Sequence, residues 1–95
     1  MSERKTTYDE KLIKIGELLK AERLNISKDS RESFISERSD TLFRSNDWIS
    51  LRHLANLEEG KNLPSIEMLI KLALAFETEP VDLFEKIFEI LNDQN

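Results

Sequence analysis

The chain has 95 residues, which is enough for one domain with a single hydrophobic core. Its 39% apolar and 35% charged residues exclude a disordered chain, and two glycines and two prolines are too few for an all-β fold. No apolar run reaches the roughly 20 residues of a membrane span, and the N-terminus lacks the apolar segment of a secretion signal. Because there is also no cysteine for disulfides, we expect a cytoplasmic protein.

The net charge of −5 is distributed unevenly. Residues 1–63 hold 12 basic and 12 acidic side chains, whereas residues 64–95 hold two lysines and seven acidic side chains. The acidity therefore belongs to the C-terminal third. It counts only mildly against DNA binding, because DNA needs a local basic face rather than a basic protein.

The first predicted helix covers residues 8–24. Thr7 and Glu10 have the spacing of a capping box, in which Thr7 caps the helix and Glu10 reaches back to it. Residues 1–7 are expected to be a flexible N-terminus. The helix carries apolar residues at helical spacing, namely Leu12, Ile15, Leu18 and Leu19.

The second predicted helix begins after Ser30, which is a suitable N-cap, and carries Phe34, Ile35 and Arg38. Leu42 and Phe43 continue its apolar stripe, so this helix is expected to be unusually long.

Three more helices are predicted in the C-terminal half. Ser50 caps a short third helix, and Gly60 is its expected stop because glycine adopts the left-handed conformation at least cost. Pro64 and Ser65 open a fourth helix, and a fifth covers residues 80–92 with a proline at its first position. No segment reads as a strand. The chain is therefore expected to form one all-α domain of five helices over residues 1–95.

The third predicted helix has two chemically different faces. Leu54 and Leu57 suit burial, whereas Arg52, His53 and Asn56 form a polar front. Arginine pairs bidentately with guanine in the major groove, and asparagine pairs in the same way with adenine. The pattern predicts a helix that reads base edges.

The residues on either side of this helix extend the predicted DNA contact. Leu51 in the first turn is expected to contact a thymine methyl group. Lys61 and Asn62, in the loop after the helix, suit phosphates and would set the register on the duplex.

The segment from Ile49 to Phe84 resembles the second half of the Cro/C1-type helix-turn-helix domain, also called the lambda-repressor-like or XRE family. The matching residues are Ile49, Ser50, Leu54, Leu57-Glu58-Glu59-Gly60-Lys61, Pro64-Ser65 and Leu72-Ala73-Leu74-Ala75. The resemblance implies a five-helix fold that binds double-stranded DNA.

The resemblance also implies roles for individual residues. The base-reading positions fall on Leu51, Arg52 and Asn56, and Glu58 is similar to the family's buried structural acid. The expected contacts to the DNA backbone are Arg31, Ser50, His53, Lys61 and Asn62.

The first half of the chain departs from the family pattern. Residues 30–39 resemble the helix that precedes the turn, and they would join Ile49 smoothly if residues 40–48 were absent. We interpret residues 40–48 as an insertion, which places Arg31 at the phosphate-contacting position. A gapless alternative makes residues 39–46 the second helix, but it places Arg44 where a small alanine normally packs.

The inserted residues have two possible uses. Leu42, Phe43 and Trp48 could extend the core, whereas Arg38 and Arg44 could contact the DNA backbone. Trp48 is expected to be a core residue rather than a platform for stacking bases.

The fifth predicted helix has more apolar residues than one buried stripe requires. One line consists of Phe84, Ile87, Phe88 and Leu91, and a second line consists of Leu83, Ile87 and Ile90. One line is expected to close the core, and the second to pair across a two-fold axis. The residues expected to take part in dimerisation come from both lines and are Leu83, Phe84, Ile87, Phe88, Ile90 and Leu91.

These features predict a transcriptional regulator, with repression as its simplest activity. Two third helices about 34 Å apart in a homodimer would read a palindromic operator. Neither an enzyme nor a cofactor or metal site is expected, because His53 is the single histidine and has no partner cluster. The alternative is a protein-interaction module, antitoxin-like or an adaptor, that uses the fold as a scaffold and its acidic C-terminal helix as the working surface.

Overall fold

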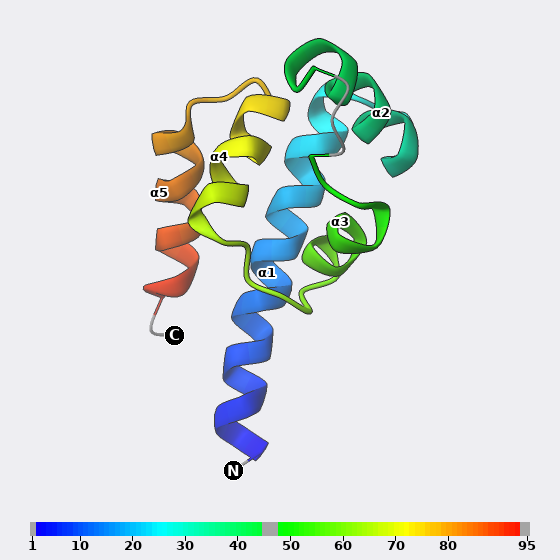
Figure 1. Cartoon of the computed structure of the whole chain (residues 1–95). Coiled ribbons are helices and arrows are strands. Elements are labelled where there is room, and N and C mark those ends of the chain that lie inside the picture. The colour runs from blue at the N-terminus through cyan, green and yellow to red at the C-terminus, as the bar shows by residue number, and fades with distance from the viewer. Residues whose placement is uncertain (1, 45–47, 94–95) are drawn as a thin grey trace.

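The computed structural model describes residues 2–44 and 48–93, with side chains described from residue 10 onward. Five helices follow one another, and this part of the chain contains no strand (Figure 1). They are α1 (Ser2–Ile26), α2 (Arg31–Leu42), α3 (Leu51–Glu58), α4 (Ile66–Ala75) and α5 (Pro80–Leu91). The predicted all-α, five-helix fold is confirmed.

Helix α1 is the longest of these five helices and packs against two of them. It contacts both α3 and α5, while α2 contacts α3 and α4. Its N-terminal turns extend past the other helices in Figure 1. The predicted start after Thr7 is wrong, because the helix begins at Ser2. No glycine or proline interrupts the first 15 residues, so a helix formed further along can propagate back through them.

Three serines cap the helices that follow. The hydroxyl oxygens of Ser30, Ser50 and Ser65 each accept a hydrogen bond from the backbone N–H three residues on, at 3.0–3.1 Å. Such caps satisfy N–H groups that a helix start leaves unpaired. All three predicted caps are confirmed, and the cap at Ser30 rules out the gapless alternative in which the second helix covers residues 39–46.

Gly60 ends α3 as predicted. It has a φ of 78°, and Lys61 N donates to Asn56 O at 2.9 Å, as in a helix terminated by a left-handed residue. A Cβ atom on Gly60 would lie 2.7 Å from the Cα atom of Ile13. Glycine is therefore required here both by the backbone conformation and by the contact with α1.

Phe34 lies at the centre of the core. Its ring centroid lies 6.2 Å from that of Trp48 and 6.0 Å from that of Phe76, and its side chain is fully buried. Trp48 is itself buried and stacks on Phe43, so its predicted role in the core is confirmed. The aromatic contacts join α2 to the segment before α3 and to the end of α4.

Candidate nucleic-acid interface

Helix α3 presents its polar front to solvent because its apolar back is held by the core. Leu54 and Leu57 are buried, and Gly16 of α1 allows the end of α3 to approach closely. On the other side, Leu51 is 45% exposed and Arg52 is exposed. The two faces predicted for this helix are therefore both present.

The other predicted DNA-contacting residues of this region lie around the same helix. His53 and Asn56 are half-buried, and Ser50 and Asn62 are exposed. The Nζ atom of Lys61 lies 3.2 Å from Oε1 of Glu59, and both side chains are largely exposed. A phosphate would have to compete with this carboxylate for Lys61, which is a modest obstacle because exposed ion pairs are weak.

Glu58, the last residue of α3, is the centre of a buried ion-pair network. Its side chain is 0% exposed and accepts two hydrogen bonds from Arg23, at 2.7 and 3.1 Å. Arg31 donates a third from Nε at 2.8 Å. The structural role expected for Glu58 is confirmed. Arg23 is a structural residue of this network that the sequence analysis missed, although it continues the buried stripe of Leu12, Ile15 and Leu19.

Arg31 was predicted to contact a phosphate, and in the structure it also forms an ion pair with Glu58. Its Nε atom is used by Glu58, while its terminal nitrogens donate no hydrogen bond within the described ranges. The side chain is 29% exposed, so those nitrogens lie at the edge of the buried network. A phosphate contact by Arg31 stays a prediction. The hydrogen bond from Arg31 Nε to Glu58 would orient the guanidinium for that contact.

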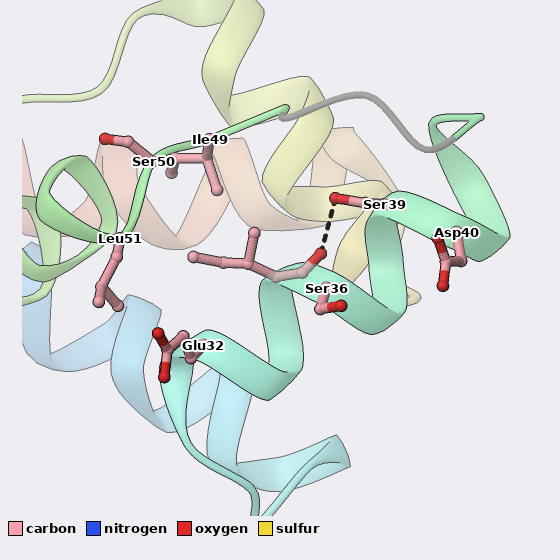
Figure 2. Close-up of a pocket in the computed structure, with 8 residues that line it drawn as sticks. Glu32, Ser36, Ser39, Asp40, Ile49, Ser50 and Leu51 are labelled. Atoms are coloured by element: carbon pink, nitrogen blue, oxygen red, sulfur yellow. Dashed lines mark hydrogen bonds between the residues drawn. The ribbon is translucent and has the colours of Figure 1, made fainter.

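A cleft separates α2 from the start of α3, and we call it the α2–α3 cleft. It has a volume of about 480 Å³. Figure 2 shows side chains from both sides of this cleft. The lining residues are Glu32, Ile35, Ser36, Ser39, Asp40, Ile49, Ser50 and Leu51. Its apolar residues are accompanied by two carboxylates and no basic side chain, a feature that the sequence analysis did not anticipate.

The proposed insertion at 40–48 is divided between two environments. Residues 40–42 complete α2, and Phe43 and Trp48 pack on the core, whereas residues 45–47 lie outside the described residues. The indole N–H of Trp48 donates to Ile35 O at 3.3 Å. The segment between α2 and α3 is thus anchored at both ends. Leu42 is largely exposed, so it adds less to the core than expected.

Arg38 packs inside the domain rather than extending into solvent. It is buried, its Nε atom donates to the carbonyl oxygen of Ala75 at 2.8 Å, and its guanidinium lies 5.4 Å from the centre of the Phe34 ring. This side chain satisfies the end of α4 instead. Arg44 is exposed and is the member of the pair that could still reach a phosphate.

The two apolar lines of α5 have exchanged the expected roles. Leu83 and Ile87 are buried within one chain rather than exposed for a partner, and Ile90 is half-buried. The line of Leu83, Ile87 and Ile90 is covered because α5 packs against α1 and α4. Phe88, in contrast, is 64% exposed. An apolar groove of about 320 Å³ runs between α4 and α5 and is lined by Ile66, Leu69, Phe84, Ile87, Phe88 and Leu91.

Other classes of site find little support in the described ranges 2–44 and 48–93. No group of three or more His, Asp or Glu side chains there is placed to hold a metal ion. No described helix combines the length and apolar character that crossing a membrane requires.

Comparison with known families identifies the central part of the chain. The model of the helix-turn-helix family matches residues 45–83, which contain α3, α4 and the start of α5. The match confirms the Cro/C1-type resemblance and supports a DNA-binding regulator of that type. It begins after α2, as expected from the departure of the first half. No curated protein and no solved structure matches the chain significantly.

Proposed function

Because residues 45–83 match a helix-turn-helix family, we propose that this protein is a sequence-specific, cytoplasmic transcriptional repressor that inserts α3 into the major groove of DNA. The observation that supports this most is the position of Arg52, exposed on a helix whose opposite face is buried against α1. A guanidinium held in this way can reach guanine O6 and N7. Bound at a promoter, the protein would block polymerase.

The remaining contacts divide by chemistry. Leu51 and Asn56 join Arg52 in reading base edges, through a thymine methyl and an adenine edge respectively. The residues proposed to hold the DNA backbone are Arg31, Ser50, His53, Lys61 and Asn62. Phosphate contacts of this kind set register without carrying sequence information.

We propose further that two copies associate through the groove between α4 and α5. Ile66 and Phe88 both line this groove and are 69% and 64% exposed, so they belong to one apolar patch rather than being isolated surface residues. The groove and the exposed Phe88 side chain lie on one patch, and a two-fold interface brings the same patch of both copies together. Helix α5 does not contact α3 in the described structure, so this interface would leave both reading helices free for a palindromic operator.

Binding of purified protein to DNA tests the main proposal. A selection from random duplexes, followed by gel shifts at two salt concentrations, would define the preferred site. Arg52→Ala is expected to remove preference at one base pair, at a cost of about 1–3 kcal/mol. Lys61→Ala is expected to weaken binding to all duplexes about equally and to reduce the salt dependence.

Lys20→Ala is the matched control, because it removes an exposed lysine of α1 that forms no ion pair in the described structure. The proposal fails if the wild-type protein shifts no duplex at low salt, or if Arg52→Ala and Lys61→Ala both bind like the wild type. The first outcome would favour the protein-interaction alternative, with exposed acidic residues of α5 such as Asp82, Glu85 and Glu89 as the working surface.

The dimer is tested separately by light scattering at tens of micromolar protein. Phe88→Glu is expected to give monomers, whereas Leu42→Glu, at an exposed apolar residue on α2, is expected to leave the dimer intact. A wild-type protein that is monomeric at this concentration would exclude the dimer but not DNA binding.

A further inference from the structure

Glu32 and Leu51 share one end of the α2–α3 cleft. Both side chains line the cleft, and Figure 2 shows the carboxylate of Glu32 on α2 facing the same opening as Leu51 at the start of α3. Both residues are exposed. The side chain of Glu32 forms no ion pair or hydrogen bond within the described part of the chain. A carboxylate and an apolar side chain are thus presented together beside the base-reading residues.

A carboxylate at this position limits which base can be accepted. Phosphates repel it, so its favourable contact with DNA is an amine on a base edge. Guanine presents two acceptors in the major groove, and thymine presents the acceptor O4 beside its methyl group. Both would place a lone pair against Glu32.

The two bases that carry an amine differ in what lies beside it. Adenine N6 lies next to the acceptor N7, which would gain nothing from Leu51. Cytosine N4 lies next to the C5 carbon, which has no polar group. The combination of a carboxylate and an adjoining leucine therefore fits the cytosine edge best among the four bases.

We propose that Glu32 is a specificity-determining residue that accepts a hydrogen bond from the N4 amine of cytosine, while Leu51 packs against the C5 edge of the same base. The inference rests on the proposed DNA binding and deepens it, because it adds a residue of α2 to the reading surface. This assignment replaces the thymine methyl proposed above as the contact of Leu51 with the C5 edge of cytosine, because the Glu32 carboxylate would be repelled by thymine O4.

Glu32 also has a purely structural explanation, which the test has to separate. It lies in the first turn of α2, where a negative charge interacts favourably with the helix dipole. Loss of this interaction would lower thermal stability slightly, but it would not change which base is selected. Base preference is therefore the decisive measurement.

The experiment compares the wild type with Glu32→Gln in selection from random duplexes, followed by titration of the selected site with each base at every position. Wild type is expected to prefer cytosine by about 10-fold over thymine at one position, the effect of one good polar contact. Glu32→Gln, which adds an amide donor, is expected to lose that preference and to favour adenine there. Glu37→Gln is the matched control, because Glu37 is an exposed residue of α2 outside the cleft.

5-Methylcytosine provides a second measurement on the same duplex. Burial of one methyl group against Leu51 is expected to tighten binding of the wild type by up to about 4-fold. The inference is overturned if Glu32→Gln selects the same sequence as the wild type, or if methylation at that cytosine weakens binding. A wild type that selects no sequence overturns the proposed function and this inference together, whereas the first two results leave the proposed function standing.

Discussion

The Nε atom of Arg31 lies 2.8 Å from Oε1 of Glu58, and this contact joins the first residue of α2 to the last residue of α3. The same carboxylate holds Arg23 of α1 at 2.7 Å. One buried side chain thus ties together the three helices that set the orientation of the reading surface. Two guanidiniums and one carboxylate leave the network with an excess positive charge, at the edge where Arg31 is partly exposed.

Glu58→Gln is expected to destabilise the protein by about 3 kcal/mol, because it leaves two guanidiniums without their buried counter-charge. Urea unfolding followed by circular dichroism would measure this loss. Glu59→Gln is the control, since Glu59 is exposed and pairs with the exposed Lys61, and it is expected to change stability by less than about 0.5 kcal/mol. Equal effects of the two changes would contradict a central role for the network.

Gly16→Ala is expected to destabilise the protein by about 1–2 kcal/mol. The added Cβ atom would lie 2.5 Å from the carbonyl oxygen of Glu58 and 2.7 Å from that of Leu57, so α1 and α3 would have to separate. Ala21→Gly is a matched reverse change, because Ala21 is exposed on the same helix, and its expected cost of about 1 kcal/mol reflects helix propensity alone. Thermal unfolding would test both, and a stabilising Gly16→Ala would disprove the close approach.

The local structure of the C-terminal half could be predicted from the sequence because each element has its own short-range signal. Ser50, Gly60 and Ser65 act through hydrogen bonds and backbone angles within a few residues of themselves, so their roles are visible in sequence spacing. The start of α1 was misplaced because a capping box is a weak signal when no residue before it breaks the helix. Helix boundaries depend on such small differences in free energy.

What could not be predicted depends on how distant segments meet. Arg23 and Arg38 lie on the apolar stripes of their helices, but only the packed structure shows that they meet Glu58 and the Ala75 carbonyl. The choice between the two lines of α5 likewise depends on which side α1 and α4 occupy. Helical spacing in the sequence predicts that a helix has an apolar face, but it does not predict which other helix packs against that face.

Glu77→Gly is expected to stabilise the protein by about 0.5–1 kcal/mol. Glu77 follows the C-cap of α4 and has a φ of 61°, a left-handed conformation that costs most residues other than glycine about 1–2 kcal/mol. The change also removes a long 3.4 Å contact to Arg38, but the Glu77 side chain is 66% exposed and the contact is therefore weak. Chemical denaturation would measure the gain. A loss of stability would mean that the Arg38 contact outweighs the backbone strain.

Lys86 of α5 and Glu22 of α1 form an ion pair whose contribution to stability is expected to depend on pH. The Nζ atom of Lys86 lies 2.7 Å from Oε2 of Glu22, and this hydrogen bond, together with the attraction between the charges, raises the pKa of Lys86 above its usual value. The charged pair therefore contributes its full stabilisation at pH values below about 10.4, the pKa of lysine in the unfolded chain. This stabilisation is lost as the pH rises through the higher pKa of Lys86 in the folded protein. Because Lys86 is half exposed, the contribution is expected to be less than about 1 kcal/mol.

The test compares the wild type with Lys86→Met across the pH range. The difference in unfolding free energy is expected to be constant between about pH 7 and 9 and to shrink above about pH 10.5, where the ammonium group is lost. Lys20→Met is the control, since Lys20 is an exposed lysine of α1 without an ion pair in the described structure, and its effect should lack this trend. A difference for Lys86→Met that stays the same at high pH would attribute the effect to the packing of the methylene chain rather than to the charge.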